Sequence, residues 1–560
     1  MSHAFVHKFI GILLGLILAF TEVSSAQAAA GSLDKSFGND GVVITDFGGS
    51  SDISEDIVVQ SDGKILVSGF SSDGKQTDFA LARYNPDGSL DAAFGAGGKV
   101  ITAMGDRDEF GSAVVLQPDS KIIVAGSAHN GSDSDIVLAR YQPDGSLDTS
   151  FGVDGRVINS DGNSSHYATD AVLQTDGKIV VTGYAFDEFG NQDILLYRYE
   201  ENGSPDTSFG IHGTVVHQFG CSAAGHAVVV QTDGKILVAG KHCGSIFYEF
   251  DFALARFNED GSLDVTFAGG GILSTGFGDG SSDEAYGIVI QPDGKIVLAG
   301  QSYLDSDSIV FALARYNPDG SLDTSFEGDG QVTTDLTGGS EVSSAIALQP
   351  DGRIIVAGEK GTLGGTDFLT MRYNSDGSPD ISFGTDGQVT TNIRTSDFGI
   401  AIALQPDGRI VLAGTSTNTH DNDFDWVVAR YEVNAPVKEA TLDLRPGRFP
   451  NRVELEKNIC KDDDNLPVAI LTTPEFDALH LVDATSLRIG DPVLGGTATP
   501  IHSQARDIDR DGDVDVWLLF ALCDLVSNNA LDENSTELVL MGKTLDGTTF
   551  SARDSVAPFR

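Results

Sequence analysis

Five aspartates near the C-terminal end of the chain have the spacing of an oxygen-rich metal loop. They lie in the segment Asp507-Ile-Asp509-Arg-Asp511-Gly512-Asp513-Val-Asp515. Calcium takes six to eight oxygen ligands, and carboxylates at alternate positions around a glycine can surround such an ion. Four of these residues would supply side-chain oxygens, and Asp513 would supply its backbone carbonyl. We therefore expect Ca²⁺ to bind here, with a plain acidic turn as the alternative.

The end of this segment distinguishes it from an EF-hand. An EF-hand loop closes with a glutamate at position twelve, whereas Leu518 stands at that position here. Residues 516–520 are apolar and predict a strand. The loop therefore resembles the aspartate-rich calcium loops of other extracellular proteins. The run 462–464, three aspartates in a row, lacks the spacing and is interpreted as a solvated loop.

Four cysteines are the next candidates for defined chemistry. Cys221 and Cys243 flank one predicted hairpin, so we expect them to pair. Cys460 and Cys523 lie together in the C-terminal part of the chain. An even number of cysteines in an exported protein favours disulfides, and four buried free thiols are the alternative. No spacing among them resembles a zinc site or a redox motif.

Residues 1–28 have the pattern of a secretory signal. Basic and histidine residues precede an apolar run over 9–20, and Ala26-Gln27-Ala28 fits a cleavage site. The run is too short to span a bilayer comfortably, and no second segment of membrane length follows. We expect a secreted monomer that is extracellular, cell-surface or periplasmic and has no membrane span after signal removal.

The charge balance narrows the range of partners. The chain carries 35 basic and 82 acidic residues, for a formal net charge of −47. Nucleic acid binding is not expected, because a phosphate backbone needs Lys and Arg to replace its counterions. Docking on anionic lipid is disfavoured for the same reason. A requirement for solubility is one explanation of the acidic composition. The more specific alternative is that some of the acidic residues bind divalent cations.

Most of the chain, about residues 31–431, consists of a repeat of about 57 residues. One mark is a glutamine before an Asp-Gly or Asp-Ser turn, at Gln60, Gln117, Gln174, Gln231, Gln291, Gln349 and Gln405. A second is an arginine before Tyr or Phe, at Arg83, Arg140, Arg198, Arg256, Arg315, Arg372 and Arg430. A third is a Gly-Ser-Leu/Pro-Asp segment beginning at Gly31, Gly88, Gly145, Gly203, Gly261, Gly320 and Gly377.

Each repeat contains four short runs that are typical of strands, joined by turns. Tight Asp-Gly turns supply the positive backbone angle that such hairpins need. Seven repeats of four strands predict an all-β, seven-bladed β-propeller, because radial repetition leaves only short edges exposed. A linear β-solenoid is the alternative, but its rungs are usually shorter than this repeat.

The order of the marks suggests how the ring closes. The chain after the signal begins with the tail of a repeat, residues 31–45, and the last repeat stops at Tyr431 without that tail. We expect the strand near Val42 to complete the last blade beside residues 401–431 and to clasp the ring non-covalently. Seven contiguous blades are the alternative.

Residues 311–326 read Phe-Ala-Leu-Ala-Arg-Tyr-Asn-Pro-Asp-Gly-Ser-Leu-Asp-Thr-Ser-Phe. This segment resembles the delta-60 repeat of bacterial secreted and surface proteins, and the resemblance covers about residues 31–431. It implies a propeller-like fold and no established activity. Residues 443–451, 468–473 and the aspartate loop together resemble a C-terminal domain appended to many secreted bacterial proteins. That resemblance implies a calcium-stabilised β accessory domain without assigned catalysis.

We therefore expect a signal at 1–28, a propeller at 29–431, a linker at 432–440 and a small β domain at 441–560. The seven repeated arginines are interpreted as structural, because identical placement in every blade does not suit one active site. Nearby aspartates are their candidate partners: Asp91, Asp148, Asp206, Asp264, Asp323 and Asp380.

Ligand contacts are expected where the repeats differ. Two connections vary between blades, and alternating strand direction brings both to one face, which we call the variable face. Loops on a rigid scaffold commonly carry recognition. Candidate residues there are His129, His166, Tyr167, His226, His242, Tyr248, Tyr286 and His420, with Asp108, Glu109, Asp283 and Glu284 as acidic neighbours.

No usual local signature of a hydrolase, metalloprotease or nucleotide-binding enzyme is found. This favours a non-catalytic extracellular protein that binds a glycan or a protein. The alternative is a propeller hydrolase or lyase acting on a sugar, lactone or phosphoester. A mouth lined by three or more inward histidines and carboxylates would favour the enzyme. A purely structural surface filler is a third possibility.

Overall fold

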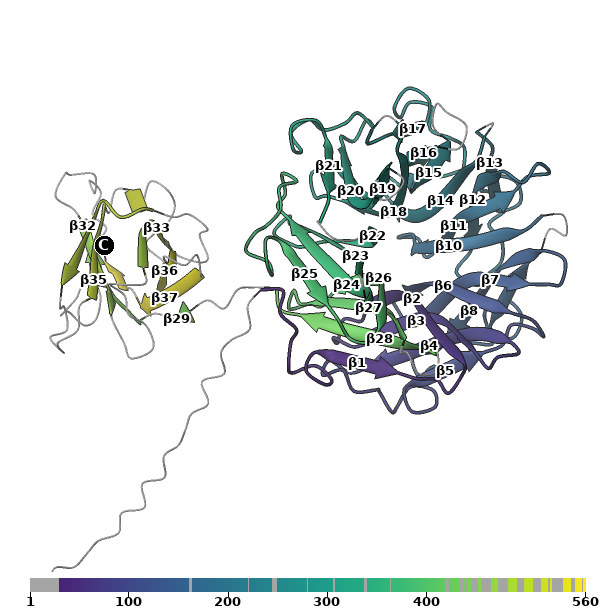
Figure 1. Cartoon of the computed structure of the whole chain (residues 1–560), viewed down its shortest axis with the longest axis horizontal. Coiled ribbons are helices and arrows are strands. Elements are labelled where there is room, and N and C mark those ends of the chain that lie inside the picture. Colours follow the sequence, from purple (N-terminus) through teal and green to yellow (C-terminus); the bar gives the residue numbers. More distant parts are fainter. Residues whose placement is uncertain are drawn as a thin grey trace, which may run out of the picture.

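The computed structural model describes residues 30–560 apart from 161–163, 220, 244–248, 279, 306–307, 337–339, 363, 418–422, 434–437, 440, 445–451, 455–464, 472–481, 491–497, 507–514, 522–523, 526–536, 545–548, 556 and 560. All of the named elements in this part of the chain are β-strands. Seven four-stranded antiparallel sheets form a ring (Figure 1). The seven-bladed propeller predicted from the repeat is therefore confirmed.

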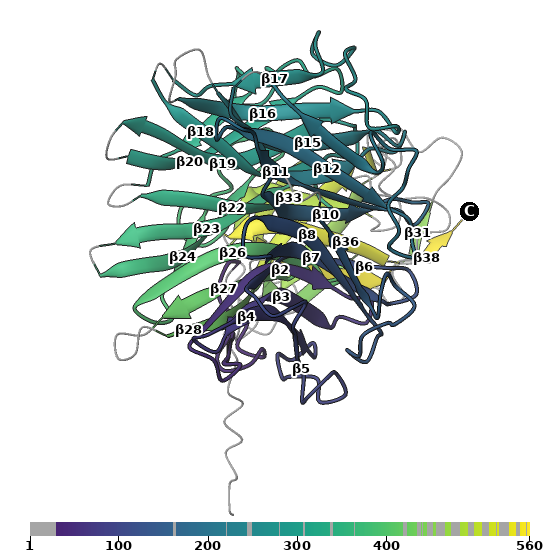
Figure 2. The ribbon, with the colours of Figure 1, turned by 90° about the vertical axis from the view of Figure 1, so that its right-hand side faces the viewer.

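Within each blade the strands follow one another from the centre of the ring outward. Blade 1 contains β2(Ser51–Val59), β3(Ile65–Ser72), β4(Thr77–Tyr84) and β5(Lys99–Thr102), and blade 2 contains β6(Glu109–Leu116), β7(Ile122–His129), β8(Ser134–Tyr141) and β9(Arg156–Asn159). Blade 3 contains β10(His166–Leu173), β11(Ile179–Phe186), β12(Gln192–Tyr199) and β13(Thr214–His217), and blade 4 contains β14(Ala223–Val230), β15(Ile236–Cys243), β16(Phe250–Phe257) and β17(Ile272–Thr275). Figure 2 shows these blades in succession from purple to teal.

The remaining blades complete the circle. Blade 5 contains β18(Ser282–Ile290), β19(Ile296–Asp305), β20(Ser308–Tyr316) and β21(Gln331–Thr334). Blade 6 contains β22(Glu341–Leu348), β23(Ile354–Thr362), β24(Gly365–Tyr373) and β25(Gln388–Thr391). Blade 7 contains β26(Ser396–Leu404), β27(Ile410–Thr417), β28(Phe424–Tyr431) and β1(Val42–Thr45). The innermost strands β2, β6, β10, β14, β18, β22 and β26 contact one another around the centre.

The last blade takes its outer strand from the beginning of the chain, as the order of the marks predicts. Strand β1 pairs antiparallel with β28, with Val42 opposite Ala429 and Thr45 opposite Trp426. The backbone N–H of Asp34 also donates to the carbonyl of Arg430 at 2.8 Å. The ring is thus closed by a non-covalent clasp between residues that are far apart in the sequence.

Apolar side chains pack between neighbouring blades, not within them. The cluster between blades 7 and 1, for example, buries Trp426 of β28, Tyr84 of β4 and Phe37 ahead of β1. The Tyr84 hydroxyl has a partner in the Thr45 hydroxyl at 2.7 Å, so its burial leaves no unpaired polar group. Similar tyrosine–threonine pairs join Tyr316 to Thr275 and Tyr431 to Thr391.

The repeated arginine joins each blade to the next. Arg256 donates from Nε to Asp264 Oδ2 at 2.8 Å and from Nη1 to the Pro318 carbonyl of the following blade at 2.9 Å. Its guanidinium also lies over the Phe267 ring, 4.3 Å from the centroid. The same arginine–aspartate bond occurs at Arg83–Asp91, Arg140–Asp148, Arg198–Asp206, Arg315–Asp323, Arg372–Asp380 and Arg430–Asp34.

The strands after the ring form three further sheets. Their order is β29-β37-β36-β33, β30-β32-β35-β34 and β31-β38. The bounds are β29(Lys438–Glu439), β30(Thr441–Leu444), β31(Arg452–Glu454), β32(Asn465–Leu471), β33(Val482–Gly490), β34(His502–Arg506), β35(Asp515–Ala521), β36(Glu537–Thr544), β37(Thr549–Ser555) and β38(Ala557–Phe559). Among the described residues, no helix is long and apolar enough to cross a membrane.

Candidate functional site: the central cavity

A β-bulge occurs at the same position of every inner strand. The pairing between the inner strand and its neighbour skips one residue, and that residue lies five positions before the hairpin glutamine. A bulge leaves its extra residue outside the ladder and re-aims its side chain. The seven bulge residues differ in chemistry and are Glu55, Ser112, Thr169, His226, Tyr286, Ser344 and Ile400.

All seven bulge residues line one cavity of about 580 Å³ at the centre of the ring. Asp56 and Asp170, each one position after a bulge, and Tyr184 of β11 line it as well. Backbone geometry therefore brings a variable column of the repeat to one place. The site combines carboxyls, hydroxyls, aromatic rings and one imidazole.

Asp56 and Asp170 are tied to the backbone. The Oδ2 atom of Asp56 accepts the N–H of Val114 in the next blade at 2.7 Å, and its Oδ1 accepts the N–H of Ile57 at 2.7 Å. Asp170 repeats the arrangement with Val228 at 2.8 Å and with the residue that follows it at 2.7 Å. These carboxyls therefore connect blades and have both oxygens occupied.

Burial raises the pKa of each acidic group in the cavity. Desolvation raises the pKa of Glu55 to about 7. It raises the pKa of Asp170 to about 6. The pKa of Asp56 rises to about 7 through burial, and the nearby charge of Asp170 adds to the rise. The cavity thus holds three carboxyl groups that change protonation near neutral pH.

A hydrogen-bonded cluster joins blades 4 and 5 on one wall of the cavity. The Tyr286 hydroxyl donates to Glu284 Oε2 at 2.6 Å, and Lys241 Nζ donates to Glu284 Oε1 at 3.1 Å. Burial alone would raise the pKa of Glu284, but the bond from Tyr286 and the charge of Lys241 hold it below its usual range. Gln301 extends the cluster by donating to the hydroxyl of Tyr303 at 3.1 Å.

His226 stacks on Tyr286 in this cluster, with ring centroids 4.9 Å apart and planes inclined by 8°. Its Nδ1 lies 3.1 Å from the backbone carbonyl of Ala285. A carbonyl can only accept, so Nδ1 carries the proton and Nε2 carries the lone pair. Burial lowers the pKa of His226 to about 4, which keeps the imidazole neutral at physiological pH.

Blade 3 contributes a second aromatic group. Tyr167 of β10 stacks on Tyr184 of β11 with centroids 5.2 Å apart, and Phe186 meets both rings edge-on. Tyr184 lines the cavity together with His226 and Tyr286. Aromatic faces from neighbouring blades therefore border the same space.

The structure brings together only some of the predicted ligand residues. His226, Tyr286 and Glu284 form the cluster, and Tyr167 belongs to the neighbouring aromatic group. His166 is buried, and its Nδ1 lies 2.8 Å from the Tyr197 hydroxyl.

The other predicted ligand residues lie elsewhere. His129 is exposed at the end of β7, while His242 packs beside Cys221, with its Nε2 3.7 Å from the cysteine sulfur. Tyr248 and His420 lie outside the described residues.

The predicted acidic neighbours organise loops. Asp283 Oδ2 accepts the backbone N–H of Phe277 at 2.9 Å, in the connection between β17 and β18. Asp108 Oδ1 accepts the N–H of Thr77 at 2.9 Å and so ties together the two variable connections of one face. Glu109 is buried at the position equivalent to Asp283, where burial raises its pKa to about 7.

The remaining cavity residues were not predicted, although the sequence contains a signal for them. Glu55, Asp56, Asp170 and Tyr184 follow none of the repeated marks. The bulge residues do share one offset, five positions before the hairpin glutamine, and that column changes in almost every repeat. Lys241 and Gln301 could not be found this way, because their roles depend on contacts across strands.

The hairpin cysteines pair as predicted. Cys221 and Cys243 form a disulfide with a Cα–Cα distance of 6.1 Å, between the loop before β14 and the end of β15. Cys460 and Cys523 lie outside the described residues. The loop aspartates Asp507, Asp509, Asp511 and Asp513 also lie outside them, while Asp515 is buried at the start of β35, opposite Arg506. The calcium loop therefore stays a prediction.

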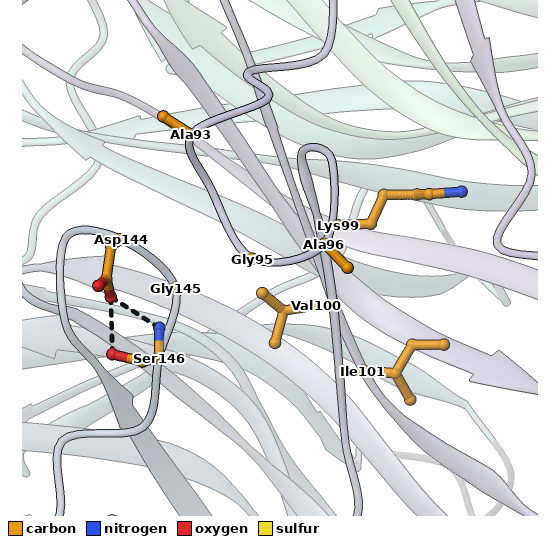
Figure 3. Close-up of a pocket in the computed structure, with 9 residues that line it drawn as sticks. All are labelled: Ala93, Gly95, Ala96, Lys99, Val100, Ile101, Asp144, Gly145 and Ser146. Atoms are coloured by element: carbon orange, nitrogen blue, oxygen red, sulfur yellow. Dashed lines mark hydrogen bonds between the residues drawn. The ribbon is translucent and has the colours of Figure 1, made fainter.

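A second hollow lies between the outer parts of blades 1 and 2 (Figure 3). In it Asp144 accepts hydrogen bonds from the backbone and the hydroxyl of Ser146, at 2.9 and 2.6 Å. The Asp144 carbonyl accepts the N–H of Gly95 at 2.8 Å. A similar hollow occurs where Gly31 meets Gly384. Both are built from repeated turn residues, so they belong to the architecture of the ring.

Comparison with known proteins identifies the ring. A family model described as a domain of unknown function (DUF5122) beta-propeller matches residues 60–94, 117–151, 174–209, 231–267, 291–326, 349–383 and 405–434. These seven matches support a β-propeller repeat family for the ring. Each match begins at a hairpin glutamine and takes in the arginine of the same repeat. The resemblance to the delta-60 repeat stays a prediction.

Several solved structures are similar to this propeller repeat protein at low identity. A protein of unknown function from Dyadobacter fermentans is 10% identical, with a TM-score of 0.40, over 70% of this chain and 98% of that chain. A virginiamycin B lyase from Staphylococcus aureus is 11% identical, with a TM-score of 0.38, over 69% and 98%. The β-propeller domain of the Trilobed protease from Pyrococcus furiosus is 10% identical, with a TM-score of 0.37, over 69% and 96%.

These similarities carry no argument about what the propeller repeat protein binds or whether it catalyses a reaction. No curated protein matches the sequence.

Proposed function

We propose that this chain is an exported, non-catalytic binding protein whose central cavity takes a polar ligand, a segment of a glycan. The observation that carries the proposal is the stacked pair of His226 and Tyr286 on the cavity wall beside the Glu284 carboxylate. A sugar ring offers apolar C–H faces to aromatic rings and hydroxyls to acceptors. This wall presents both kinds of partner, the aromatic rings of His226 and Tyr286 and the carboxylate acceptor of Glu284.

The size and lining of the cavity support a ligand of this kind. Small-molecule sites usually enclose about 300–1,000 Å³ and combine aromatic side chains with a few well-placed polar groups. The cavity volume of about 580 Å³ falls within that range. Tyr184 adds an aromatic face from blade 3, and Tyr303, which is 38% exposed, lies beside the cluster toward the variable face.

Binding is favoured over catalysis because most ionisable groups are already engaged. Both oxygens of Asp56 and of Asp170 accept backbone N–H groups. Both oxygens of Glu284 accept from Tyr286 and Lys241. The groups left for acid–base work are Glu55 in blade 1 and His226 in blade 4, which lie three blades apart in the ring.

One observation favours the alternative of a propeller hydrolase or lyase. A histidine with a free Nε2 lone pair and three carboxyls with a pKa of about 6 to 7 line the same cavity. General acid–base catalysis works best with groups that titrate near the operating pH. His226 would then be the base and Glu55 the acid.

A glycan array probed with the full chain, followed by calorimetry, tests the binding proposal. We expect the Tyr286→Ala and Tyr184→Ala variants each to lose about tenfold or more in affinity for the selected glycan, or roughly 1.4 kcal/mol, as loss of an aromatic contact implies. His129→Ala, on an exposed strand end away from the cluster, is the matched control and should bind like the wild type. Absence of any glycan ligand, or unchanged affinity in both tyrosine variants, would count against the proposal.

The same glycan distinguishes binding from catalysis. After long incubation, hydrolysis would release new reducing ends, and a lyase would release unsaturated products that absorb ultraviolet light. We expect neither. Turnover that the wild type shows and His226→Gln lacks would establish the enzyme instead.

Export and calcium complete the proposal. The pattern of residues 1–28 supports cleavage after Ala28, which N-terminal sequencing of the secreted protein would test. The spacing of the aspartates at 507–515 supports a calcium ion that stabilises the strands after the ring.

A further inference from the structure

The place where the ring closes carries three carboxylates from three different segments. Asp46 directly follows the clasp strand β1, Asp52 lies in β2 of the first blade, and Asp425 lies in β28 of the last blade. One oxygen from each lies within 4.8 Å of the others. This group, which we call the seam triad, therefore spans both sides of the non-covalent closure.

The innermost member, Asp52, lies near the Ser71 hydroxyl, but one of its buried oxygens receives no hydrogen bond of good geometry from the part of the chain that the structure describes. Asp52 is only 1% exposed, and its Oδ2 accepts the backbone N–H of Phe47 at 2.7 Å. Among the described residues, no hydrogen bond of good geometry reaches its Oδ1. A buried oxygen of this kind costs free energy unless a proton or a cation meets it.

The other two members complete an accessible site. Asp425 is 9% exposed, and Asp46 is exposed to solvent. Burial raises the pKa of Asp52, and the charges of Asp46 and Asp425 add to the rise, while the nearby Ser71 hydroxyl and the Phe47 N–H offset part of it. The triad is thus a set of like charges, one of them exposed at Asp46, that a cation would relieve.

The same three positions can be compared at the other six blade junctions. At each of them, at least one position holds a residue without a carboxylate. The sets are Ala103, Glu109 and Asp78; Ser160, His166 and Asp135; Gln218, Ala223 and Asp193; Gly276, Asp283 and Asp251; Asp335, Glu341 and Val310; Asn392, Asp397 and Asp367. Within the ring, three acids therefore coincide only at the seam, where the outer strand β1 is joined to β28 by non-covalent contacts alone.

Two basic groups border the triad. Arg394 forms an ion pair with Oδ2 of Asp425, which leaves Oδ1 of that residue for another partner. Three carboxylates together with Arg394 and Lys99 carry a formal charge of −1, so the triad keeps a net negative charge that attracts a cation. Lys99 Nζ donates to the backbone carbonyl of Asp46 at 2.9 Å on the exposed side. Hard divalent cations, calcium above all, prefer such a set of oxygens.

We propose that a calcium ion binds between Asp46, Asp52 and Asp425 and ties the last blade of the propeller to the first. The ion would reinforce the junction between β28 and β1, the one place where a blade lacks the covalent connection between its third and outer strands. This site is separate from the aspartate loop at 507–515 and does not depend on the glycan proposal.

Calcium titration of the full chain by calorimetry tests this proposal. An Asp509→Asn, Asp511→Asn variant removes the predicted C-terminal loop site and should still bind one calcium ion. Adding Asp46→Asn and Asp425→Asn to that variant should abolish the remaining binding. Asp251→Asn, at the equivalent position of another junction, is the matched control and should leave it unchanged.

Amide hydrogen exchange tests whether calcium holds the clasp closed, which the number of bound ions alone does not show. At free calcium of about a hundredfold Kd, opening of the clasp should become about a hundredfold rarer. The amides of Val42–Thr45 should therefore exchange more slowly in the wild type and in the loop variant, but not after Asp46→Asn. This single exposed substitution keeps the test open if the double seam variant fails to fold.

Two results would overturn the proposal. One is a folded loop variant that binds no calcium. The other is a calcium titration or clasp exchange rate that the seam substitutions leave unaltered. Either would show that Asp52 and its neighbours share protons instead of a metal ion.

Discussion

At the scale of single residues, repeated and variable side chains have different roles. The arginine, aspartate and phenylalanine of each repeat join neighbouring blades, as in the contact of Arg256 with Asp264, Phe267 and the Pro318 carbonyl. The bulge residue of each inner strand instead points to the central cavity and changes from blade to blade. Identical contacts build the ring, and the column of bulge residues is free to vary.

His226 offers a direct test of the cavity electrostatics. Burial lowers its pKa to about 4, so we expect its ring to stay neutral down to about that pH and to carry its proton on Nδ1. Nitrogen-detected NMR of labelled protein would report both properties. The exposed His129 serves as the reference resonance. Protonation of His226 above pH 6 would contradict the buried, carbonyl-bonded geometry.

At the scale of elements, the clasp strand is the one outer strand that the chain does not join directly to its own blade. Strand β1 has four residues and is held by its ladder with β28 and by Asp34, which accepts from Arg430 Nε at 2.8 Å. In the other six blades the equivalent aspartate lies eight residues after its arginine, in the same continuous stretch of chain. The contact between Asp34 and Arg430 therefore has to hold the ring closed as well as stabilise a blade.

Asp34→Asn should destabilise the propeller and release the clasp. Removing one partner of a buried ion pair typically costs about 3–5 kcal/mol, because the other charge remains buried. Asp206→Asn removes the equivalent partner of Arg198 within a contiguous blade and is the control. We expect both variants to unfold at lower denaturant concentration, but only Asp34→Asn to make residues 30–45 sensitive to limited proteolysis. Equal protection of that segment in both variants would refute the role of the clasp.

The repeat made the blades, the clasp and the arginine–aspartate pairs predictable because each depends on residues at fixed offsets. The Cys221–Cys243 disulfide was predictable because both residues flank one hairpin. The cavity was only partly predictable. Contacts such as Lys241 with Glu284 and His226 with the Ala285 carbonyl join different blades, and the bulge that turns His226 inward is a property of the backbone. A residue pattern along one strand does not reveal either.

At the scale of the whole molecule, the acidic character of the chain continues into its interior. Burial raises the pKa of Glu55, Asp56, Glu109, Glu341 and Glu359 to about 7, and that of Asp170 to about 6. The protein has a formal net charge of −47, and protonation of these buried carboxyls favours its folded state. This predicts an unusual dependence of stability on pH.

The propeller should become more stable as the pH falls from 8 to about 5. A carboxyl with a raised folded-state pKa penalises folding fully above that pKa, and the penalty disappears as the pH drops toward the unfolded value near 4. Each tenfold change in proton affinity between the folded and unfolded chain is worth about 1.4 kcal/mol. Six such carboxyls therefore outweigh His226, whose lowered pKa acts in the opposite direction over the same range.

Thermal unfolding in the presence of a chelator, which removes any calcium effect, measures this dependence. We expect the Tm to rise by several degrees between pH 8 and pH 5 and to fall again below about pH 4, where aspartates such as Asp148 lose their ion pairs. Burial would raise the pKa of Asp148, but bonds from Ser150 and the charges of Arg140 and Lys121 lower it to about 2. Glu55→Gln should flatten the rise, while Glu327→Gln, at an exposed turn, should not. A Tm that is higher at pH 8 than at pH 5 would show that water or a cation reaches these carboxyls and keeps them ionised.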